Sequence, residues 1–153
     1  MIALRAVESA DGDALHAIFT EPGVRRFLFD DLELTRAETQ EHVEAASAQD
    51  AWTIRRDGEI VGLVALRPVG ADRELIVAVS ERHWGSGAAL QAARHSMRHG
   101  FDMLGLGRIL ATVDLPNERS HRLMARLGFA PTGEGDGPKY RFRRYEALRR
   151  SGT

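Results

Sequence analysis

The chain has 153 residues, 43% of them hydrophobic and 28% charged, which are ordinary values for one globular domain. Its formal net charge of −1 gives no bulk electrostatic reason to bind nucleic acid or an anionic membrane. The absence of cysteine excludes disulfides, thiolate metal ligands and a cysteine nucleophile. No apolar run approaches the roughly 20 residues that a membrane span needs, and the first residues lack the features of a signal peptide. We therefore expect a cytoplasmic single-domain protein.

The first third of the chain predicts one strand and two or three helices. Residues 2–7 alternate apolar and polar side chains, which is typical of a short strand. A helix should start at residues 11–13 and be stopped at Pro22 by the Pro-Gly pair. Residues 24–34 mix aromatic and acidic side chains and suit a short helix or a loop. The capping box that opens residues 35–49 predicts a further helix there.

The middle of the chain predicts three strands. Residues 51–56 and 60–67 flank an Asp-Gly pair at residues 57–58, which predicts a hairpin. Residues 68–72 are expected to form a loop. Residues 74–80 are apolar on both faces, so we expect a buried central strand.

The next segment alternates helices and a strand. Residues 88–104 carry apolar side chains at intervals of three and four, which predicts a long amphipathic helix. Residues 108–113 form a strand that should lie parallel to residues 74–80, because a helical crossover joins the two. Residues 118–127 predict a second crossover helix, ended by Gly128.

The end of the chain completes the sheet. Phe129 begins another strand, residues 133–138 predict a mobile glycine-rich loop, and residues 140–148 predict the last strand. The resulting order of elements predicts an α/β chain whose mixed sheet carries helices on both faces.

A glycine-containing turn separates the buried strand from the long helix. It has the pattern Arg82-x-x-Gly85-x-Gly87. Backbone N–H groups at the start of a helix are unpaired and lie at the positive end of the helix dipole, which suits an anionic phosphate. The Walker and dinucleotide patterns both fail here, since no Gly-Lys-Ser/Thr follows and the third glycine is missing. A turn without any ligand is the alternative interpretation.

Two motifs resemble those of the GNAT N-acetyltransferases. Residues 82–89, Arg-His-Trp-Gly-Ser-Gly-Ala-Ala, resemble the pyrophosphate loop of that family. Residues 117–120, Asn-Glu-Arg-Ser, followed by Gly-Phe at residues 128–129, resemble its second motif. Together with the Gly-Leu-Gly-Arg-Ile run at residues 105–109, they are closest to the ribosomal-protein alanine acetyltransferase (Rim-like) branch. The resemblance implies one N-acetyltransferase domain over residues 1–153, with a mostly antiparallel sheet and one splayed parallel strand pair.

The same resemblance implies acetyl-CoA as co-substrate and no metal. The contacts that it implies are the backbone of Val77, Ala78 and Val79 for the pantetheine arm, backbone N–H groups of Trp84, Gly85, Ser86, Gly87, Ala88 and Ala89 for the pyrophosphate, Arg82 for the adenosine end, Asn117 for the cofactor arm, and Ser120 near the sulfur.

The expected reaction is direct attack of a primary amine on the thioester in a ternary complex. It needs a neutral amine, a stabilised oxyanion and a proton for the departing thiolate. Many family members have a tyrosine as this acid where the present chain has Met124, so the resemblance implies Ser120 as the donor. Glu74 is the expected base, with water as a possible relay, and Tyr140 is an outside candidate for the acid.

Structural roles compete with these assignments. Asn117 follows a proline and suits a helix N-cap, and Ser120 suits close helix packing. Glu74 would also fit a solvated strand end. His95 and His99 lie four residues apart on a helix, but no suitably spaced carboxylate accompanies them, so surface positions are favoured over a metal site.

The sequence does not identify the acceptor. A protein or peptide N-terminus and a small-molecule amine are both open, and a homodimer is common in the family. The residues expected to form the acceptor walls are Phe27, Phe29, Trp52, Tyr140, Arg141, Arg143 and Arg144. The acidic residues Asp30, Asp31 and Glu33 are expected either to be solvated or to attract a cation. Two other classes compete with the enzyme: a catalytically weak acyl-CoA-binding sensor or partner domain, and a nucleotide-binding domain unrelated to CoA.

Overall fold

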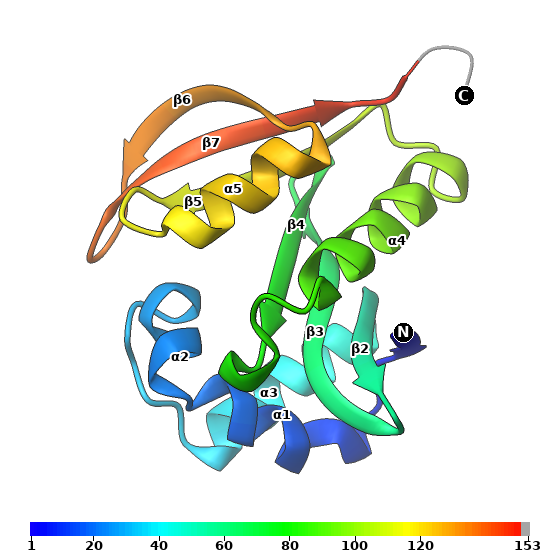
Figure 1. Cartoon of the computed structure of the whole chain (residues 1–153), viewed down its shortest axis with the longest axis vertical. Helices are drawn as coiled ribbons and strands as arrows, with labels where there is room; N and C mark the ends of the chain where they lie inside the picture. The colour runs from blue at the N-terminus through cyan, green and yellow to red at the C-terminus, as the bar shows by residue number, and fades with distance from the viewer. Residues whose placement is uncertain (151–153) are drawn as a thin grey trace.

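A computed structural model describes residues 1–150, and its centre is one seven-stranded sheet in the order β1-β2-β3-β4-β5-β7-β6 (Figure 1). The strands are β1 (Ala3–Ala6), β2 (Asp50–Arg56), β3 (Glu59–Val69), β4 (Asp72–Val79), β5 (Arg108–Asp114), β6 (Ala130–Asp136) and β7 (Arg141–Leu148). The helices are α1 (Gly12–Phe19), α2 (Pro22–Leu28), α3 (Arg36–Ser47), α4 (Ala88–Asp102) and α5 (Glu118–Leu127), with short 3-10 turns η1 (Ser9–Asp11) and η2 (Glu81–His83). Within the described part of the chain, no helix has the length and apolarity to cross a membrane.

Strands β1 to β4 form an antiparallel meander. The predicted hairpin turn between β2 and β3 has positive φ at Asp57 (52°) and Gly58 (82°), as a two-residue turn of this hand requires. The predicted loop over residues 68–72 is wrong: β3 runs to Val69, which pairs with Asp72, so only two residues turn the chain. The two strands are therefore longer than their apolar patterns.

Strands β4 and β5 are parallel, and they separate after a single pair. Glu74 lies opposite Leu110, and beyond this pair the two strands diverge (Figure 1). β5 instead pairs along its whole length with β7, from Arg108↔Leu148 to Asp114↔Phe142. The predicted mixed, mostly antiparallel sheet with one splayed parallel pair is confirmed.

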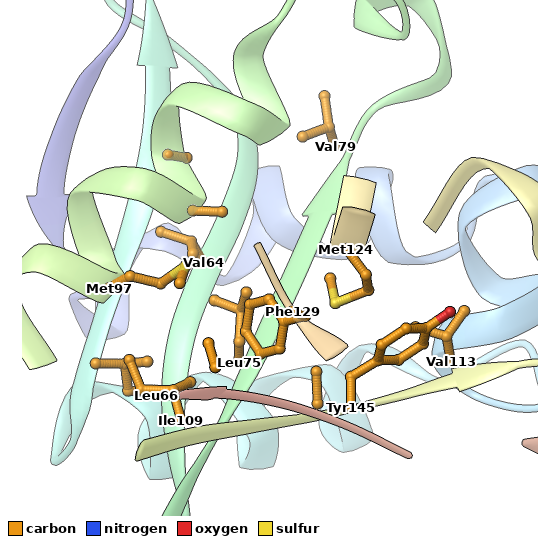
Figure 2. Close-up of a cluster of buried hydrophobic side chains, with 14 of the residues drawn as sticks. Val64, Leu66, Leu75, Val79, Met97, Ile109, Val113, Met124, Phe129 and Tyr145 are labelled. Atoms are coloured by element: carbon orange, nitrogen blue, oxygen red, sulfur yellow. The ribbon is translucent and has the colours of Figure 1, made fainter. Parts of the chain in front are cut away.

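Each face of the sheet has its own hydrophobic core. On one face, Leu63 and Ala65 of β3 pack with helices α1 and α3. On the other face, Val64 and Leu66 join α4, and this core continues to Phe129 and onto β7 (Figure 2). The alternation of strand side chains produces both cores from one continuous apolar run.

Two predicted boundaries are wrong for local reasons. Pro22 is the first residue of α2, because its missing N–H is tolerated there, and α1 has already ended at Phe19. The loop predicted over residues 133–138 is mostly strand β6, in which Gly135 pairs with Phe142 and Asp136 with Arg141. The glycines favoured a loop in the sequence, but backbone pairing with β7 makes this segment a strand.

Candidate coenzyme and acceptor site

A cavity of about 1230 Å³ lies where β4 and β5 diverge. Its walls come from α2 and α3 on one face of the sheet, and from the start of α4 and from α5 on the other. The cavity therefore connects both faces through the gap in the sheet. Two different molecules can approach one another in it from opposite sides.

The edge of β4 that faces the gap has free backbone groups. The Ser80 N–H donates to the Val61 carbonyl at 2.8 Å. The even-numbered residues of β4 therefore direct their backbone N–H and C=O groups toward β3, because these groups alternate along an antiparallel pair. Val77 and Val79 consequently direct their N–H and C=O groups toward the gap. The Val79 carbonyl accepts a bond from the Trp84 indole N–H at 2.9 Å. Ala78 faces β3, so its predicted backbone role is wrong, and Val77 is the principal free position.

The loop between η2 and α4 presents a group of unpaired N–H donors. Gly85 (φ 79°) and Gly87 (φ 84°) adopt the left-handed conformation that favours glycine. Among the described residues, the N–H groups of Gly85, Gly87 and Ala89 have no acceptor. Such donors at a helix start suit a phosphate. We call residues 84–89 the glycine loop.

Not every predicted donor of the glycine loop is free. The Trp84 N–H donates to the Glu81 carbonyl at 3.1 Å, and the Ser86 N–H donates to the His83 carbonyl at 3.3 Å. The Ser86 hydroxyl also donates to the His83 carbonyl, at 2.6 Å, and lies 3.4 Å from the Ala88 N–H. Trp84 and Ser86 therefore shape the loop, and their N–H groups are already used.

Arg82 does not line the cavity, against the prediction for the adenosine end. Its guanidinium pairs with Glu59 at 3.5 Å, and its side chain is 67% exposed. It borders a separate depression beside α1 that also includes Ser80. The turn of η2 directs Arg82 toward the β2–β3 hairpin, and sequence spacing alone contains no information about that direction.

Arginines of α5 line the cavity, and the sequence interpretation missed them. Arg119, Arg122 and Arg126 all belong to the lining. The Arg119 guanidinium lies 3.7 Å from the centroid of the Trp84 ring, a cation–π contact. Their spacing of three and four residues is a helical-face signal that was available in the sequence.

Asn117 and Ser120 form one hydrogen-bonded pair at the start of α5. The Asn117 side-chain oxygen accepts from the Ser120 N–H at 3.3 Å, which makes Asn117 the N-cap. Its side-chain N–H donates to the Ser120 hydroxyl oxygen at 3.0 Å. Because that oxygen is an acceptor here, the hydroxyl proton is free to be donated elsewhere. Both residues line the cavity.

Two carboxylates line the cavity where β4 and β5 separate. Glu74 is 7% exposed and pairs with Arg67 at 2.5 Å, so it is not a solvated strand end. Asp114, at the end of β5, was not predicted from the sequence. Burial, followed by the nearby charge of Asp30, raises the pKa of the Asp114 carboxyl.

Neither Tyr140 nor Trp52 lines this cavity. Tyr140 packs against Phe27, with ring centroids 5.5 Å apart, and is not part of the lining, so its candidacy as the acid is not supported. Trp52 instead contacts the ring of His99 at 5.0 Å, so its placement in the acceptor wall is wrong. His99 also binds Asp50 at 3.1 Å, and within residues 1–150 no cluster of three or more possible ligands suits a metal.

Most of the charged residues expected near the acceptor form local ion pairs. Asp31 binds both Arg25 and Lys139, and the bond from Lys139 lowers the pKa of its carboxyl. Glu33 binds Arg25 at 3.1 Å. The arginines of β7 bind groups of β6: Arg141 pairs with Asp136 and Glu134, Arg143 pairs with Glu134, and Arg144 donates to the Glu134 carbonyl. These arginines are ordinary strand residues.

Residues 2–130 match the acetyltransferase (GNAT) domain family. The chain belongs to the GNAT acetyltransferase family. It is 29% identical over 140 residues to the spermidine N(1)-acetyltransferase of Escherichia coli, covering 87% of this chain and 75% of that relative. The predicted family and the predicted N-acetyltransferase activity are confirmed, whereas the Rim-like branch stays a prediction.

Solved structures share the fold across nearly the whole chain. A GNAT acetyltransferase from Bacillus anthracis has a TM-score of 0.87 at 20% identity, covering 96% of this chain and 94% of that chain. A spermidine N-acetyltransferase from Vibrio cholerae, in complex with CoA and spermine, has a TM-score of 0.80 at 19% identity, covering 96% and 95%. Acetyl-CoA, the predicted co-substrate, agrees with the family and with the free donors of the glycine loop.

Proposed function

We propose that this GNAT enzyme transfers the acetyl group of acetyl-CoA to a primary amine of a small molecule by direct attack in a ternary complex. One observation carries the proposal: a single cavity joins the glycine loop, the free edge at Val77 and the buried carboxylate of Glu74. The spermidine acetyltransferase relative supports an amine of small size.

Acetyl-CoA supplies an activated acetyl thioester when it is bound. The N–H groups of Gly85, Gly87 and Ala89 bind its pyrophosphate, and Val77 binds the pantetheine arm along the strand edge. The Asn117 side chain uses one N–H and one oxygen lone pair on Ser120, so its second N–H remains for the cofactor arm.

The acceptor enters from the α2 and α3 side. Phe27 and Phe29 give this side an apolar wall, while Glu74 and Asp114 can accept hydrogen bonds from an ammonium group. The amine must lose a proton before it attacks. We assign that proton to Glu74, directly or through water, and the orientation of the ammonium to Asp114. Ser120 then donates its hydroxyl proton to the departing thiolate, and the second proton that the attacking nitrogen loses as the amide forms returns to the Ser120 oxygen, directly or through water.

Release of free CoA thiol over a panel of polyamines, aminoglycosides and N-terminal peptides tests the function. We expect at least one small-molecule amine to raise thiol release above the rate without acceptor. Turnover with peptides alone would instead indicate a protein N-terminus as acceptor. Tight CoA binding without turnover on any amine would indicate the sensor alternative.

The two carboxylates can be separated by matched amide variants. Glu74→Gln should lower kcat by about 100-fold, the usual effect of losing a general base. Asp114→Asn should mainly raise the KM for the amine. The reverse pattern would exchange the two roles.

A further inference from the structure

The wall of the cavity that α5 forms is strongly cationic. Arg119, Arg122 and Arg126 line it, at intervals of three and four residues along one helix face. Within residues 1–150, none of these three guanidinium groups makes an ion pair. The same wall has one carboxylate, Glu118. The charge of this helix face is therefore only partly balanced by the protein.

Nine other arginines among residues 1–150 have carboxylate partners. Arg108, for example, binds both Asp72 and Glu146 at 2.8 Å. The arginine face of α5 (Arg119, Arg122 and Arg126) differs from these because three arginines on one helix border the cavity without such partners in the described part of the chain. Arg26 of α2 also lines the cavity without an ion pair to any described residue, but it stands alone over the Phe27 ring. An anionic ligand inside the cavity would supply them.

Arg119 connects this face to the glycine loop. Its guanidinium stacks on the Trp84 ring at 3.7 Å, and stacking uses the face of the group, so the N–H donors around its edge remain available. Trp84 itself is held by its bond to the Val79 carbonyl. Guanidinium donors and the free N–H groups of Gly87 and Ala89 therefore border the same cavity from opposite sides.

We infer that the arginine face of α5 binds the phosphate groups of the nucleotide end of CoA, opposite the glycine loop. Guanidinium groups match phosphate oxygens with paired hydrogen bonds, which a lone ammonium cannot do. The motif resemblance assigned the charge for this end of the coenzyme to Arg82, which lies outside the cavity. The inference rests on the proposed use of acetyl-CoA.

Calorimetric titration of single variants with CoA tests the inference. Arg119→Gln, Arg122→Gln and Arg126→Gln should each weaken CoA binding, by about 10-fold for a lost charge-assisted hydrogen bond. Arg94→Gln removes the same charge from α4, outside the cavity lining, and should bind CoA like the parent protein. Thermal unfolding of each variant confirms that its fold is intact.

Two truncated ligands complete the test. With S-acetyl-pantetheine, which has no phosphates of the nucleotide end, the kcat/KM values of the α5 variants should stay within about twofold of the parent value. If a variant binds dephospho-CoA more weakly than the parent does, its arginine contacts the pyrophosphate. If the variant and the parent bind dephospho-CoA equally, the arginine contacts the 3′-phosphate. Both outcomes support the inference. Equal losses with CoA and S-acetyl-pantetheine, or unchanged CoA binding in all three variants, would overturn it. A parent protein that does not bind CoA would instead contradict the proposed function.

Discussion

The substitution Gly87→Ala isolates the contribution of the glycine loop to coenzyme binding. Gly87 has a φ of 84°, and an added Cβ would lie 3.6 Å from the Gln91 side-chain nitrogen, an ordinary contact. The cost is therefore that of the left-handed backbone, about 1–2 kcal/mol for an L-residue. For a chain of this size, we expect Tm to fall by roughly 2–8 °C.

The same strain should weaken CoA binding. If the loop of the free variant relaxes from this conformation, binding must restore it, and 1–2 kcal/mol corresponds to a roughly 5- to 30-fold higher Kd. Gly58→Ala is the matched control, because Gly58 has a φ of 82°, no atom within 4 Å of its added Cβ, and a place in the β2–β3 turn. It should lower Tm equally and leave the Kd for CoA unchanged. Calorimetry and thermal unfolding measure both quantities. An unchanged Kd in Gly87→Ala, or an equal rise in Gly58→Ala, would refute the reasoning.

Three further substitutions test other parts of the site. Ser120→Ala should lower kcat by about 10- to 100-fold while the Kd for CoA stays within about threefold, as measured by thiol release and calorimetry; an unchanged kcat would remove Ser120 as proton donor. Asp114→Asn should raise Tm at pH 7. The pKa of the Asp114 carboxyl is raised in the folded state, so its ionisation destabilises the fold as pH rises through that pKa, and Asn cannot ionise. The gain in Tm should vanish below the pKa of an unfolded aspartate, near 3.9. Trp84→Phe removes the 2.9 Å bond to the Val79 carbonyl, so Tm should fall by about 2–4 °C, for a net cost of about 1 kcal/mol; no change would show that another donor replaces the indole.

Features set by neighbouring residues were predictable from the sequence. The capping box at Thr35 is present, with the Glu38 N–H bound to the Thr35 hydroxyl at 3.1 Å and the reciprocal bond at 2.9 Å. The Asp57-Gly58 hairpin and the glycine loop also follow from local backbone preferences. The parallel pair followed from the helical crossover between its strands.

Directions of side chains were not predictable, because distant segments decide them. Arg82 turns toward Glu59 of the hairpin, and Trp52 turns toward His99 of α4. The raised pKa of Asp114 was not predictable, because it comes first from burial in the fold and then from the charge of Asp30, which is more than 80 residues away in the chain. The sequence motif identified the glycine loop, whereas tertiary packing decided that arginines of α5, and not Arg82, line the cavity beside it.

The two halves of the sheet are joined unequally on their two faces. On the α4 and α5 face, one core extends from Val64 to Tyr145 and crosses the gap between β4 and β5 (Figure 2). On the opposite face, the described core cluster contains residues only as far as Ala78, so it belongs to the first half alone. The hydrophobic core that joins the two halves of the sheet thus lies on the coenzyme side. A small rotation of one half of the sheet about this core would therefore change the width of the acceptor entrance more than the width of the coenzyme side.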